Sequence, residues 1–132
     1  MPIKLMPDTC VWIDFLRNRD TMLTRQLEQS LLQGEVYTCG VVLYELLQGI
    51  RTPGEDEQVR AAFDALAMCE TTAKTWGTAA VISAALRSRG ITLPMSDIII
   101  AAVALEHGLT IMTVDQHFQQ IVAAIAPQGK FG

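Results

Sequence analysis

The sequence predicts an α/β protein with a mainly parallel sheet, and three observations lead to this fold class. The chain has 132 residues, a typical length for one domain. Half of its residues are hydrophobic and only 18% are charged, a composition that excludes a disordered chain. Short β-rich runs alternate with helical patterns, without repeats or flexible linkers. We therefore expect residues 1–132 to form a single domain.

The first part of the chain predicts two strands and two helices. Residues 3–6 form a short apolar run that ends at a Pro-Asp pair, which is typical of a strand followed by a turn. A helix begins at Asp8, because apolar residues recur after it at helical spacing. Residues 21–33 carry leucines four positions apart, and Gly34 ends this second helix. Residues 35–39 are rich in strand formers.

The middle of the chain predicts three helices and one strand. Residues 41–50 form a strongly apolar helix that is interrupted by Glu45. After a Thr-Pro-Gly loop, residues 55–67 again place apolar side chains at helical spacing. Residues 68–70 are a short strand, and residues 72–89 form a longer helix that ends at a glycine.

The last part of the chain predicts a buried helix, a strand and a final helix. Residues 98–107 follow Asp97 and are apolar on every side, so this helix should be buried. Residues 110–114 are rich in strand formers, and Asp115 opens a helix with a single apolar stripe. Because helices connect the strands, the sheet should be mainly parallel with right-handed crossovers.

Composition and charge narrow the possible functions. The net charge of −4 and the pI of about 5.0 argue against binding nucleic acid through a broad basic surface. The longest apolar run has eight residues, whereas a membrane helix needs about 20. No signal-peptide pattern is present, so we expect a cytoplasmic protein. The three cysteines lie far apart and fit neither a disulfide framework nor a zinc site.

Four carboxylates differ from the acidic residues on polar helix faces. Asp8 and Asp115 each follow a predicted strand and precede a helix, while Asp97 begins the all-apolar helix. Glu45 lies among apolar neighbours in its helix. Each aspartate alone could simply cap or stabilise a helix N-terminus. Glu45 alone could lie on a narrow exposed stripe, because burial without a partner costs several kcal/mol.

Considered together, these four carboxylates predict a metal site. Ligands of parallel sheets bind beyond the carboxyl ends of strands, where the strand order reverses, and Asp8 and Asp115 should both lie there. Converging carboxylates repel one another unless a cation neutralises them or some stay protonated. Oxygen ligands without His or Cys favour Mg²⁺ or Mn²⁺, ions that commonly serve phosphoryl chemistry. Such ions could attract phosphate although the protein is acidic.

Several other residues are candidates for contacts with a phosphate backbone. His117 lies two positions after Asp115 and could reach a phosphate. Five arginines could contact phosphates or could simply be solvated: Arg17, Arg19, Arg51, Arg87 and Arg89.

Four sequence blocks resemble the PIN domain, and most of all the VapC toxins of type II toxin–antitoxin systems. The blocks read DTCVWIDFLR at 8–17, YELLQG at 44–49, SDIIIAA at 96–102 and TVDQHF at 113–118. Their acids follow one another at intervals of 37, 52 and 18 residues, and the resemblance covers residues 3–125. One block alone is weak, whereas four in this order are fairly specific.

The resemblance implies a three-layer α/β/α sandwich of the PIN fold and a metal-dependent endoribonuclease activity. It implies that four carboxylates form the Mg²⁺ or Mn²⁺ site: Asp8, Glu45, Asp97 and Asp115. Asp8 and Asp97 would be the firmest ligands, and the hydroxyl residues Thr9 and Thr113 would support the site. A metal-activated water would attack the scissile phosphorus and leave 3′-hydroxyl and 5′-phosphate ends.

The resemblance also implies partners, and two alternative functions stay open. It implies a homodimer and a VapB-type antitoxin, through which the pair would bind promoter DNA. The segment before Asp97 carries no Lys or Arg, so the residues that position RNA are not identified. One alternative is a non-catalytic PIN-like module that only binds protein. An aspartate-based phosphotransfer or phosphatase domain fits less well, because Thr9 and Cys10 follow Asp8 without a second acid.

Overall fold

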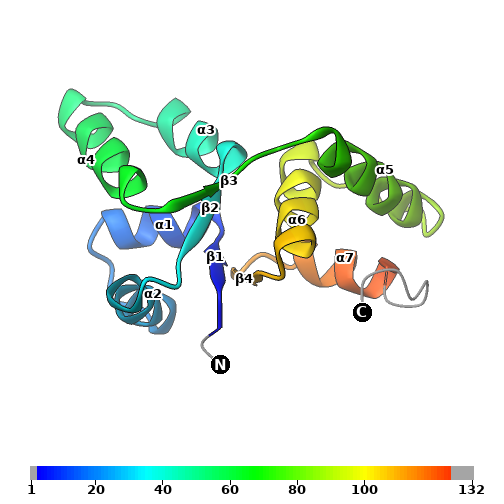
Figure 1. The fold of residues 1–132 in the computed structure, drawn as a ribbon, viewed down its shortest axis with the longest axis horizontal. Coiled ribbons are helices and arrows are strands. Elements are labelled where there is room, and N and C mark those ends of the chain that lie inside the picture. Colours follow the sequence, from blue (N-terminus) through cyan, green and yellow to red (C-terminus); the bar gives the residue numbers. More distant parts are fainter. Residues whose placement is uncertain (1–2, 126–132) are drawn as a thin grey trace.

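A computed structural model of the protein describes residues 3–125, in which four strands and seven helices alternate (Figure 1). In chain order, the elements are β1 (Leu5–Pro7), α1 (Thr9–Leu16), α2 (Met22–Gln33), β2 (Tyr37–Cys39), α3 (Gly40–Gln48), α4 (Pro53–Asp64), β3 (Ala67–Cys69), α5 (Ala73–Arg87), α6 (Met95–His107), β4 (Thr110–Met112) and α7 (His117–Ile125). Every predicted element is present in this order. The ends of the predicted single domain, residues 1–2 and 126–132, lie outside the described residues.

All strand pairs are parallel, as predicted. β1 pairs with β4, with Leu5 opposite Thr110, and β2 pairs with β3. A parallel bridge between Leu5 and Val36 connects the two pairs and gives the order β3-β2-β1-β4. The strand order therefore reverses between β1 and β4, which is where ligands of parallel sheets bind.

The helices form one layer on each side of the strands. Figure 1 shows α1 to α4 on one side and α5 to α7 on the other. This is the predicted three-layer arrangement. Its physical reason is connectivity, because a crossover between parallel strands must pass over a face of the sheet. None of the described helices is long and apolar enough to cross a membrane.

Helix α6 forms the centre of the core, as its apolar sequence predicts. Residues Ile98–Ala104 are all buried, and the helix ends at Gly108 in the left-handed conformation with φ 64°. Glycine adopts this conformation without steric cost. On the other side of the sheet, fully buried Trp12 packs against Phe63 with ring centroids 5.0 Å apart. The core thus fills both spaces between sheet and helices.

Two predicted boundaries near the acidic residues are wrong. Helix α6 begins at Met95 instead of after Asp97, so Asp97 lies in the first turn. Strand β4 ends at Met112, two residues before the predicted end. The cause is Thr113, whose Oγ1 accepts a hydrogen bond of 2.9 Å from the backbone N–H of Asp115. This local side-chain bond turns the chain away from the sheet.

Candidate active site

Asp8 lies at the carboxyl end of β1 and is anchored by three donors. Its Oδ1 accepts a 2.8 Å hydrogen bond from the backbone N–H of Thr9, which makes Asp8 the N-cap of α1. Its Oδ2 accepts from the hydroxyl of Thr113 at 3.0 Å and from the thiol of Cys10 at 3.5 Å. Thr113 follows β4, so its hydroxyl ties the carboxyl ends of the neighbouring strands β1 and β4 together. The carboxylate is 6% exposed and held in a fixed orientation.

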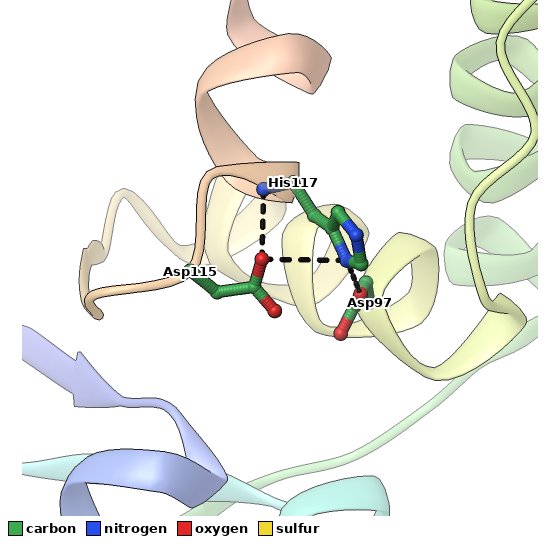
Figure 2. Close-up of side chains that lie close together, drawn as sticks. All are labelled: Asp97, Asp115 and His117. Carbon is green, nitrogen blue, oxygen red and sulfur yellow. Dashed lines mark hydrogen bonds and ion pairs between the residues drawn. The ribbon is translucent and has the colours of Figure 1, made fainter.

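Asp97, Asp115 and His117 meet where α6, α7 and the loop after β4 come together (Figure 2). The Nδ1 atom of His117 lies 2.6 Å from Oδ2 of Asp97 and 3.4 Å from Oδ1 of Asp115. The same Oδ1 accepts a 2.9 Å hydrogen bond from the backbone N–H of His117. The imidazole therefore bridges two carboxylates that come from different elements.

Glu45 reaches the site from α3. Its Oε1 accepts a 2.7 Å hydrogen bond from the hydroxyl of Thr9, which fixes a half-buried carboxylate next to the start of α1. The negative charge of Glu45 contributes to raising the pKa of Asp97, so the two groups lie close enough to interact. All four predicted carboxylates thus surround one region at the carboxyl ends of β1 and β4.

Burial and mutual repulsion make this region a poor place for negative charge. Burial raises the pKa of Asp8, with a further contribution from the charge of Asp97, and outweighs its three hydrogen bonds. Burial also raises the pKa of Asp97, with added repulsion from Asp115 and Glu45, although His117 opposes the shift. The hydrogen bond to Asp97 raises the pKa of His117 and favours its charged form. Positive charge is therefore stabilised in this cluster.

The donor set fits a divalent cation. Asp97, Asp115 and His117 each offer one ligand atom, and these atoms lie within 4.8 Å of one another. Carboxylate oxygens suit Mg²⁺ and Mn²⁺, whereas an imidazole nitrogen is more typical of sites for zinc and other transition metals. The buried carboxylate of Asp8 faces the same region and interacts with Asp97. The cluster could hold a metal ion, which would relieve the repulsion among its acids.

The predicted site residues take positions that the sequence could only partly specify. The structure brings Asp8, Glu45, Asp97 and Asp115 together, with Thr9 and Thr113 bonded to two of them. Their assignment as catalytic residues stays a prediction. The sequence analysis predicts that His117 could reach a phosphate, but it does not predict the contact with Asp97. The sequence signal for a role in the site is the position of His117 two residues after Asp115. Nothing in the sequence pointed to Cys10 as a donor to Asp8.

The parallel sheet reverses its strand order between β1 and β4, and carboxylates lie at that point. These features define a class of α/β proteins with an acidic site that can hold a metal ion. The chain matches the PIN domain family over residues 5–124 and belongs to that family. Within it, the chain is of the VapC type. It is 33% identical over 102 residues to Ribonuclease VapC21 of Mycobacterium tuberculosis H37Rv. The aligned segment covers 74% of this chain and 73% of the relative.

Solved structures support the same fold. The VapBC2 structure of Rickettsia felis, bound to a promoter DNA fragment, matches with a TM-score of 0.75 at 16% identity, covering 88% of this chain and 91% of that one. VapBC-1 of nontypeable Haemophilus influenzae matches with a TM-score of 0.75 at 17% identity, covering 90% and 92%. At these identities, the likeness concerns the fold alone.

Proposed function

We propose that this protein is a metal-dependent endoribonuclease and the toxin of a type II toxin–antitoxin module. The observation that carries the proposal is the cluster of Asp8, Asp97, Asp115 and His117 at the strand switch point, in a chain similar to a VapC ribonuclease. Buried acids that lie close together and have raised pKa values destabilise the folded protein when they are charged. They suit a site that binds a cation and a phosphodiester.

Each residue of the site has a distinct role in the proposal. Asp8 and Asp97 hold the cation, while Asp115 and Glu45 complete its surroundings directly or through water. Thr113 orients Asp8, and Thr9 orients Glu45. When bound, Mg²⁺ or Mn²⁺ supplies the positive charge that polarises the phosphate and lowers the pKa of water.

His117 tunes the charge of this site. Its Nδ1 atom forms a hydrogen bond with Oδ2 of Asp97. A cation at the site would bind the same oxygen, so the imidazole and the cation compete for this carboxylate. The hydrogen bond between Asp115 and the backbone of His117 fixes the start of α7 beside the cluster. The histidine therefore positions Asp97 and Asp115 before the substrate arrives.

The proposal includes partners and location. We infer that residues 1–132 act as one domain in the cytoplasm, form a homodimer and pair with a VapB-type antitoxin. Promoter DNA would be contacted through the antitoxin. Similarity to VapBC2 of Rickettsia felis, a structure that includes promoter DNA, supports this view. The net charge of −4 fits it too, since domains that bind DNA through a broad basic surface normally carry a net positive charge.

The test is cleavage of RNA by the purified protein with Mg²⁺, with Mn²⁺ and with EDTA. We expect cleavage with either ion, none with EDTA, and products that carry 5′-phosphate and 3′-hydroxyl ends. The Asp8→Asn variant should be inactive. Metal-independent cleavage would overturn the mechanism. Binding of the antitoxin without any cleavage of RNA would favour the non-catalytic module instead.

A further inference from the structure

A hollow of about 420 Å³ adjoins the acidic cluster and is not explained by it. It lies between α1, α3, α4 and the loop after α3, and Glu45 belongs both to its wall and to the cluster. Its volume falls in the range of sites for small ligands, about 300–1,000 Å³. Its lining combines apolar side chains, such as Ile13, Leu16 and Ile50, with charged ones.

Two arginines without an ion pair in the described part of the chain lie together in the lining of this hollow. Arg17 and Arg51 line it, are exposed, and form no ion pair within residues 3–125. By contrast, three other arginines are paired with aspartates: Arg19, Arg25 and Arg60. The guanidinium groups of the hollow are thus available to bind a ligand anion.

The two carboxylates in the wall form no direct ion pair with these arginines. Glu45 accepts a hydrogen bond from the hydroxyl of Thr9. Glu55 accepts a hydrogen bond of 3.3 Å from the backbone N–H of Arg51, and not from its guanidinium. Both guanidinium groups can therefore still bind an anion directly, and guanidinium groups are well suited to phosphate.

We propose that the hollow is a subsite for one nucleotide of single-stranded RNA next to the cleaved bond. A phosphate would lie on Arg17 and Arg51, and the ribose and base would lie against Ile13, Leu16 and Ile50. This inference rests on the proposed function. RNA is favoured over a protein segment because its phosphates alternate with apolar base faces, which matches a lining that combines arginines with apolar side chains next to the acidic cluster.

The lining also predicts how selective this subsite is. No aromatic side chain lines the hollow, so a base cannot stack there on a ring. The contacts are those of phosphate and apolar surface, which all nucleotides share. The subsite should therefore increase affinity for RNA with little preference among bases.

Binding of labelled single-stranded RNA to an Asp97→Asn background tests the proposal without cleavage. We expect Arg17→Gln and Arg51→Gln each to weaken binding by about three- to ten-fold. Each should also lower the slope of log affinity against log salt concentration by about 0.7. The matched control is Arg25→Gln, which removes an exposed arginine outside the hollow and should bind like its parent.

Kinetics in the wild-type background provide a second measurement. Both variants should raise KM for an RNA of about ten nucleotides with kcat unchanged, because the lost contact forms equally in substrate and transition state. For a dinucleotide that offers only the scissile phosphate, KM should not change. Unchanged melting temperatures would exclude misfolding as the cause.

The outcomes separate this proposal from the proposed function. If wild type cleaves RNA but the hollow variants bind and cleave as Arg25→Gln does, the subsite is wrong and the nuclease stands. Unchanged RNA binding with lost binding of the antitoxin would assign the hollow to a protein and overturn the subsite. If wild type cleaves no RNA at all, the proposed function itself fails.

Discussion

The acidic residues of this protein occupy two contrasting regions. On the surface, three aspartates lie 2.6–2.8 Å from arginines four or five residues along the chain: Asp14 with Arg19, Asp20 with Arg25 and Asp56 with Arg60. At the carboxyl ends of β1 and β4, Asp8, Asp97 and Asp115 face one another, and His117 is the basic group paired with them in the described residues. Local pairing governs the first region, whereas tertiary packing governs the second.

The two regions shift carboxylate pKa values in opposite directions. Arg25 lowers the pKa of exposed Asp20, whereas burial raises the pKa of Asp97. Exposed pairs contribute little to stability, because water and salt screen them. The buried acids disfavour the folded state when they are charged and no cation is bound. Residues that oppose stability in this way are typical of functional sites.

The largest expected difference between the regions is in catalysis. Asp97→Asn should reduce the rate of RNA cleavage by more than about 100-fold, since the loss of groups that only support metal ligands already costs 10–100-fold. Asp56→Asn removes a charge of the same kind from the surface and should leave the rate unchanged. Initial rates with Mg²⁺ measure both. Similar rates for the two variants would contradict the contrast between the regions.

Metal binding should separate the regions by a thermal shift. At a Mn²⁺ concentration 100-fold above Kd, binding stabilises the folded state by about 2.7 kcal/mol, which corresponds to roughly 10 °C in melting temperature. Wild type and Asp56→Asn should both show this shift, and Asp97→Asn should not. An equal shift in all three proteins would place the ion outside the acidic cluster.

Asp8 allows the cost of buried charge to be separated from helix capping. Asp8→Asn keeps an oxygen for the N–H of Thr9 and removes the charge, so the metal-free variant should melt a few degrees above wild type. Asp8→Ala also loses the cap, which is worth about 1 kcal/mol, and should melt about 3–5 °C below Asp8→Asn. Thermal denaturation in EDTA measures both variants. A lower melting temperature for Asp8→Asn than for wild type would mean that the hydrogen bonds outweigh the charge.

The smallest expected effect is a pH dependence that comes from His117. Its pKa in the folded protein is raised above the ordinary 6.5, mainly by Asp97. The folded state therefore binds the proton more tightly than the unfolded state does. This stabilisation is complete below pH 6.5 and is lost as pH rises through the folded pKa. In EDTA, the melting temperature of wild type should fall over this range more than that of His117→Gln. Parallel curves would show that the imidazole does not bind Asp97 in solution.

Local patterns in the sequence predict the helices and strands and single out four acids. Helical spacing placed α2 and α4, glycines marked the ends of α2 and α6, and the all-apolar run of α6 predicted its burial. The three aspartates Asp8, Asp97 and Asp115 stand out because each lies at a predicted strand end or helix start, and Glu45 stands out because its neighbours are apolar. These signals are local, since they depend on periodicity and on neighbours along the chain.

The contacts between these side chains depend on how the strands and helices pack, and the sequence pattern does not reveal them. The bonds of Thr113 to Asp8, Thr9 to Glu45 and His117 to Asp97 join residues that are 105, 36 and 20 positions apart. Such contacts depend on strand order and on how helices pack, and neither leaves a periodic pattern in the chain. The hollow beside Glu45 has the same origin, because four separate segments build its wall. Periodicity selects the elements, and packing across the reversed sheet brings their acids together.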